Sequence, residues 1–179
     1  MDQQNVALWK QFGAALDMLD DALRVCPDDL WRERLWITPA NAEFPPDFAS
    51  FWYLGYHTIH WVDLYLFGSE EGFSPPDGFS CVELDMNGAA PEQGYSREMV
   101  RAYLSQVRQR CQAKLVHMTK EETLRPCSFP WIDSSLSYFE LQLYSMRHVQ
   151  EHVAQLHLFL GNHDADGDSD WVSIARSSV

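Results

Sequence analysis

Apolar residues recur at steps of three and four along four stretches of the chain, which is the spacing of one face of an α-helix. The pattern predicts helices over residues 3–25, 50–67, 96–119 and 138–160. Residues that end helices follow three of these stretches: Pro27, Gly68 and, just beyond the fourth, Gly161. Since no stretch reads convincingly as a strand, we expect an all-α fold. Residues 1–179 should form a single domain, a four-helix up-and-down bundle with long crossover loops.

Two of the predicted connections are long for a compact domain. Residues 32–50 contain three prolines that forbid a continuous helix, and residues 69–95 are rich in glycine, proline and acidic residues. A loop as long as 69–95 without elements of its own is unusual and is often functional. We expect it to cross the end of the bundle and to cover a pocket or a partner subunit.

The charge and composition exclude several classes of partner. Thirteen Lys and Arg against 26 Asp and Glu give a net charge of −13, which repels polyanions, so no nucleic acid is expected. Without a signal peptide or an apolar run of about 18 residues, no membrane span is expected either. The four cysteines form no CxxC pair, so we expect them to be buried free thiols in a cytoplasmic protein. They are Cys26, Cys81, Cys111 and Cys127.

Two histidines of the fourth predicted helix suggest a metal site. His148 and His152 are four residues apart, so their side chains share one helix face and can reach one divalent metal. A third histidine, His57, lies in the apolar stripe of the second predicted helix. If these two helices are neighbours, the three imidazoles can meet, and such a set with an open position suits zinc or nickel.

The same residues have other interpretations. Histidine pairs at this spacing are often incidental, and a histidine in an apolar stripe is more often part of a hydrogen-bonded core. His60 competes with His57 for the third position but lies about 60° round the helix and ranks lower. Residues 148–152 also fit the HxxEH motif of inverted zinc peptidases, with Glu151 as general base. Only 27 of the 179 residues follow that motif, too few for the downstream domain that supplies the third ligand.

Helical phase identifies four candidate neighbours of the metal. Tyr144 and Gln155 lie on the histidine face of the fourth helix, where either could hydrogen-bond a ligand. Trp61 lies one turn beyond the histidine of the second helix, although core packing is its plainer role. Glu151 could orient a ligand or a water molecule, and its plainer interpretation is a solvated acid.

Two segments resemble one known family. They are FWYLGYHTIHWVDLYL around His57 and MRHVQEHVAQL around His148 and His152, and they resemble the DinB-like (damage-inducible) superfamily of bacterial four-helix bundles. The resemblance implies these three histidines as ligands of a divalent metal. The chain departs from the commonest form at Ala154, where glycine often stands. Characterised relatives include thiol-dependent transferases and an isomerase that uses a low-molecular-weight thiol, while many members have no known activity.

Two kinds of function are therefore expected. The first is a metal-dependent enzyme, a thiol-dependent transferase or a small-molecule hydrolase, which uses water or a thiolate at the open metal position. The second is a non-catalytic metal-binding or dimeric interaction protein. A homodimer would suit an aromatic-rich bundle with long loops, but no residue in the sequence determines the oligomeric state.

Overall fold

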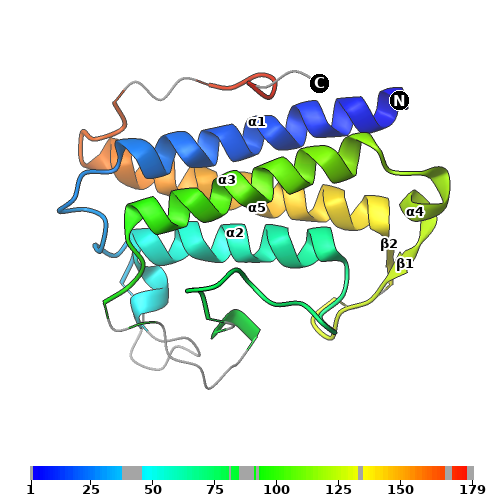
Figure 1. Ribbon diagram of the computed structural model, residues 1–179. Helices are drawn as coiled ribbons and strands as arrows, with labels where there is room; N and C mark the ends of the chain where they lie inside the picture. The colour runs from blue at the N-terminus through cyan, green and yellow to red at the C-terminus, as the bar shows by residue number, and fades with distance from the viewer. Residues whose placement is uncertain are drawn as a thin grey trace.

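Four long helices carry the hydrophobic core in the computed structural model, which describes residues 2–37, 46–80, 82–84, 91, 93–132, 135–167 and 171–176 (Figure 1). The long helices are α1 (Gln3–Val25), α2 (Phe51–Phe67), α3 (Arg97–Val116) and α5 (Tyr138–Asn162). Shorter elements lie in the connections: η1 (Pro46–Ala49), η2 (Val82–Leu84), α4 (Lys120–Leu124), β1 (Pro126–Cys127) and β2 (Leu136–Ser137). The helical bundle expected from the hydrophobic pattern is confirmed.

Local capping chemistry explains where several helices begin and end. The side chain of Ser137 accepts a hydrogen bond from the backbone N–H of Glu140, and the carboxylate of Glu140 accepts one from the backbone N–H of Ser137, so a capping box starts α5. Gly68 ends α2 with a φ of 85°, which only glycine adopts readily. Helix α3 ends at Val116, before the expected residue 119, because Thr119 instead caps the short helix α4.

The expected end of the fourth helix is corrected. Gly161 does not terminate α5, which continues to Asn162. The cost of one glycine in a helix, about 1 kcal/mol, is small beside the packing of a 25-residue helix against the bundle. The connection between α3 and α5 holds α4 and a two-stranded antiparallel ribbon.

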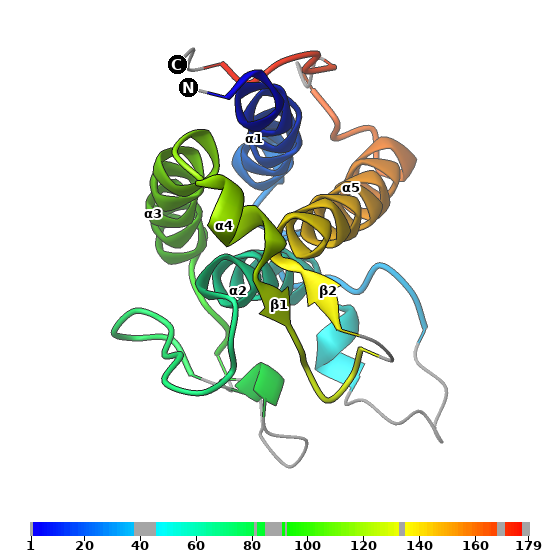
Figure 2. The same cartoon turned by 90° about the vertical axis from the view of Figure 1, so that its right-hand side faces the viewer.

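The helices occupy the four corners of the bundle, with α2 between α3 and α5 (Figure 2). Helices α2 and α3 run in one direction, and α1 and α5 run in the other (Figure 1). The ion pair between Asp63, near the end of α2, and Arg110, in the later part of α3, agrees with the parallel arrangement. Because α2 and α3 are parallel, the connection 69–95 has to bring the chain back along the bundle.

The C-terminal segment lies along α1 (Figure 2). It is held there by polar contacts. The backbone of Ala175 donates a hydrogen bond of 2.9 Å to the carbonyl of Lys10. Arg176 pairs with the carboxylate of Asp21, and its backbone donates to Asp17 at 2.7 Å. These contacts fix the tail on the bundle.

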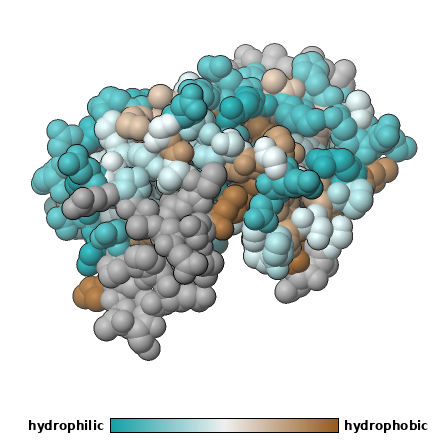
Figure 3. Space-filling view, turned by 60° about the horizontal axis from the view of Figure 1, so that its bottom comes forward, coloured by the Kyte–Doolittle hydropathy of each residue, from teal (hydrophilic) through white to brown (hydrophobic). Residues whose placement is uncertain are grey.

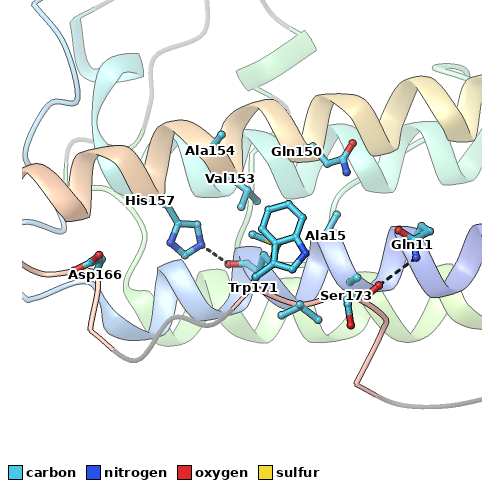
Figure 4. A pocket seen from close by; sticks show the side chains of 12 residues that line it. Gln11, Ala15, Gln150, Val153, Ala154, His157, Asp166, Trp171 and Ser173 are labelled. Atoms are coloured by element: carbon cyan, nitrogen blue, oxygen red, sulfur yellow. Dashed lines mark hydrogen bonds between the residues drawn. The ribbon is translucent and has the colours of Figure 1, made fainter.

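A groove of about 490 Å³ lies between α1, α5 and this tail (Figure 4). Its floor is apolar, with Ala15, Val153 and Ala154, and Trp171 stands over it (Figure 4). Nε2 of His157 donates a hydrogen bond of 3.3 Å to the carbonyl of Met18. The α5 residues of the groove lie about half a turn round the helix from His148 and His152, so the groove is separate from the histidine pair.

One face of the molecule is mostly hydrophilic and is hollowed near its centre, where hydrophobic residues are visible (Figure 3). Across the described parts of the chain, no helix combines the length and the apolar character that a membrane span requires.

Candidate metal centre

Three imidazoles from two helices converge on one point. Nε2 of His148 lies 3.2 Å from Nε2 of His57 and 2.9 Å from Nε2 of His152. Two nitrogens that share a zinc ion at bonds of about 2.1 Å lie about 3.4 Å apart in a tetrahedral site. The two spacings are therefore within about 0.5 Å of that of a metal-ligand set. Among the described residues this is the group of three His, Cys or acidic side chains that could hold a metal ion.

Antiparallel packing of α2 against α5 brings these residues together. His57 lies in the first half of α2, and His148 and His152 lie near the middle of α5. The side chain of His57 is 24% exposed, so solvent reaches one side of the centre.

Hydrogen bonds on the far ring nitrogens leave lone pairs on the converging ones. Nδ1 of His152 lies 2.7 Å from Oε1 of Gln155, and Nδ1 of His57 lies 2.8 Å from Oε2 of Glu83. Both oxygens accept, so both Nδ1 atoms carry the proton and both Nε2 atoms offer a lone pair. This is the tautomer that a metal ion bound at Nε2 requires.

The buried histidines stay neutral at physiological pH. Burial, with the neighbouring His57 and His152, lowers the pKa of His148 to about 3. Burial and His57 also lower the pKa of His152, against a smaller opposing effect of the hydrogen bond to Gln155. Nδ1 of His148 is buried without a hydrogen-bond partner in the described part of the chain. Neutral imidazoles without competing protons are the form that binds metal.

Glu83 is the residue that sequence reasoning missed. It lies in η2, within the long connection between α2 and α3, and its side chain is 6% exposed. Burial raises its pKa, but the charge and hydrogen bond of His57, with Tyr53, outweigh burial and hold the pKa of Glu83 below its usual value. The acidic loop was expected to be functional, but nothing in its sequence distinguishes this acid from the others.

The predicted neighbours lie at different distances from the centre. Nε1 of Trp61 is 3.2 Å from Nδ1 of His57, and Gln155 contacts His152 as described above. The ring of Tyr144 instead packs against Tyr65, with ring centroids 5.5 Å apart. Glu151 is exposed and affects His152 through its charge, which raises the pKa of that imidazole.

His60, the competitor for the third position, lies outside the cluster. It is fully buried, its ring packs edge-on to Phe73 at 5.4 Å, and burial lowers its pKa to about 4. Its place is the aromatic core beneath the histidine cluster, as its helical phase predicts.

The sequence of the chain matches a known protein family. No curated protein and no solved structure matches the chain. The family model of the DinB superfamily matches residues 11–156, a span that contains His57, His148 and His152. Because the match covers well over half of the sequence and all three converging histidines, the chain belongs to the DinB superfamily.

Proposed function

We propose that this protein is a metal-dependent enzyme that acts on small molecules and holds one zinc or nickel ion on His57, His148 and His152. The observation that carries the proposal is the convergence of three Nε2 atoms, two of them with lone pairs fixed by hydrogen bonds on the opposite nitrogen. The 24% exposure of His57 supports an open side at which a substrate can approach.

The chemistry we propose is transfer of a low-molecular-weight thiol to a small electrophile, with hydrolysis of a small substrate as the related possibility. A divalent ion on this set would lower the pKa of a bound thiol or water, so that a nucleophile forms at neutral pH. The residues of the chain would hold the ion and orient its ligands. The aromatic rings beside His57, those of Tyr53 and Trp61, would limit the access of water.

The cysteines of the described chain favour an external thiol. Cys26, Cys111 and Cys127 are buried free thiols. Burial raises the pKa of Cys26 to about 12 and raises those of the other two as well, so thiolates do not form on them at neutral pH. Cys81 lies outside the described residues. None of these three thiols therefore suits a nucleophile at the centre, which favours a thiol from a small molecule.

Metal analysis of the purified protein tests the site. We expect one divalent ion per chain in the wild type and none in the His57→Ala/His148→Ala/His152→Ala variant. His117→Ala removes an exposed histidine outside the cluster and is expected to keep the metal. Stoichiometric metal in the triple variant would refute the site.

Activity separates the enzyme from the alternative. The metal-loaded protein should accelerate the reaction of a chromogenic haloarene with a small thiol, and the triple variant should not. A protein that binds metal but shows no rate enhancement with a panel of thiols and electrophiles, and whose spectra indicate a fourth protein ligand, would be the non-catalytic metal-binding or dimeric module instead.

A further inference from the structure

Glu83 has a buried, charged carboxylate that lies beside the proposed metal centre but is not one of its three ligands. Its Oε2 accepts a hydrogen bond from Nδ1 of the neutral imidazole of His57, 2.8 Å away. Burying a carboxylate is costly unless the charge is paired and hydrogen-bonded. A buried acid that faces the far nitrogen of a metal-binding histidine therefore calls for a specific role.

Two N–H groups, one from Trp61 and one from His57, lie within hydrogen-bond distance of the carboxylate of Glu83. Nε1 of Trp61 lies 3.1 Å from Oε2 of Glu83 and 3.2 Å from Nδ1 of His57. The indole N–H only donates, and an ionised carboxylate only accepts. With Glu83 in place, both Nδ1–H of His57 and the indole N–H can donate to the same carboxylate oxygen.

Removing the carboxylate would reverse this arrangement. The indole N–H of Trp61 would then have Nδ1 of His57 as its remaining acceptor at 3.2 Å. A hydrogen bond to Nδ1 favours the tautomer that carries its proton on Nε2. That proton would sit between His57 and His148, whose Nε2 atoms are 3.2 Å apart, and would block the lone pair that binds metal.

The charge of Glu83 also fits a particular kind of ligand. A divalent ion on three neutral imidazoles brings two positive charges, and Glu83 brings one negative charge. One anionic ligand, such as a thiolate or hydroxide, would leave the group neutral, which is the favourable condition in a partly buried site.

We propose that Glu83 is a positioning residue: it keeps the proton of His57 on Nδ1 against the competing hydrogen bond from Trp61, and so keeps Nε2 free to bind the ion. This inference rests on the proposed metal site. It assigns a role to the long connection between α2 and α3, because η2 carries Glu83 to the centre.

Four variants of the full-length protein test the role of Glu83. Glu83→Ala removes the acceptor, Glu83→Gln keeps a carbonyl oxygen but loses the charge, and Glu83→Ala/Trp61→Phe also removes the competing donor. Glu71→Gln is the matched control, an exposed acid of the same connection with the same change in charge. Zinc affinity is measured by competition with a chromophoric chelator, and the tautomer of His57 by ¹⁵N NMR of the metal-free protein.

We expect Glu83→Ala to lower zinc affinity by about 10- to 100-fold and to move the proton of His57 to Nε2. Glu83→Gln should keep the proton on Nδ1 and lose less affinity. The added Trp61→Phe change should restore part of the affinity, which a merely structural role for Glu83 would not produce. Glu71→Gln should match the wild type.

The outcomes separate this role from the metal site itself. A wild type without stoichiometric metal would refute the site. A wild type that binds zinc, together with a Glu83→Ala variant within threefold of its affinity or with its proton still on Nδ1, would overturn only the role of Glu83. If Glu83→Ala does not fold, a Glu83→Gln variant with the proton of His57 on Nε2 would overturn it equally.

Discussion

Gly55 allows α2 to approach α1 closely, and replacing it with alanine tests how tightly the helix that carries His57 is packed. A Cβ at this position would lie 2.6 Å from Cδ2 of Leu23, a distance that real contacts do not reach, and 3.9 Å from Cγ1 of Val100. Leu23 is fully buried, so its side chain has little room to move. Alanine gains up to about 1 kcal/mol in helix propensity. Overpacking costs about 1–3 kcal/mol, so a net loss of about 1 kcal/mol is expected.

Gly161→Ala is the matched control for this prediction. At Gly161 the nearest atom to a new Cβ is Oδ2 of Asp166 at 3.9 Å, an ordinary contact, and the residue lies inside α5. Alanine should therefore stabilise the protein by about 0.5 kcal/mol, less than the full propensity because the site is near the helix end. If Gly161 ended the helix in a left-handed conformation, the same change would destabilise it.

Urea unfolding followed by circular dichroism measures both variants, with the midpoint compared at constant slope. A double-mutant cycle adds the mechanism: Leu23→Ala should cost less in the Gly55→Ala background, because it removes the side chain that the new methyl displaces. A Gly55→Ala protein as stable as Gly161→Ala, or strict additivity with Leu23→Ala, would refute the packing argument.

Three further predictions concern the tail, a helix cap and the metal. The Arg176 guanidinium, which hydrogen-bonds Asp21, holds the pKa of that carboxyl below its usual range. The pair therefore stabilises the fold above about pH 4, and the contribution is lost as the pH falls through the lowered pKa. Arg176→Ala should cost about 0.5 kcal/mol at pH 7, since the arginine is half exposed, and less at pH 2.5; equal losses in urea unfolding at the two pH values would contradict this. Ser137→Ala should cost about 1 kcal/mol in the same assay by removing the cap of α5, whereas Ser105→Ala, at an exposed helix position, should change stability by less than about 0.5 kcal/mol. Zinc at about 1,000 times its dissociation constant should add about 4 kcal/mol to the unfolding free energy of the wild type, and a similar gain in the triple histidine variant would exclude these ligands.

The sequence predicted the helices because their signals are local. Hydrophobic periodicity set the four long helices, and capping residues such as Ser137 and Gly68 act on their own backbone neighbours. Short elements with few residues to carry a pattern were not predictable in this way. The ribbon of β1 and β2 has two residues in each strand, and its pairing depends on contacts that form only in the folded protein.

The histidine pair of α5 was foreseeable for the same reason, because helix geometry fixes which side chains share a face, whereas the third proposed ligand, His57, was implied by the resemblance to the family. Helical phase predicted that Tyr144 and Gln155 would both lie beside the histidines, but the structure separates them. The direction of their side chains explains the difference. Side chains in a helix lean toward its N-terminus. Gln155, three residues after His152, leans back onto it, whereas Tyr144, four residues before His148, leans away toward Tyr65.

Glu83 could not be found from local pattern, yet the topology accounts for its position. Helix α2 has 17 residues and is about 25 Å long, a distance that about eight extended residues can cross. The connection back to the start of α3 is far longer than this return requires. Part of this extra length is held against α2 before η2 begins. Phe79 stacks on Tyr56, and the hydroxyl of Tyr56 donates a hydrogen bond of 2.6 Å to the carbonyl of Ser80. Because Tyr56 is next to His57 in α2, this contact places the carboxylate of Glu83, three residues after Ser80, beside the imidazole of His57.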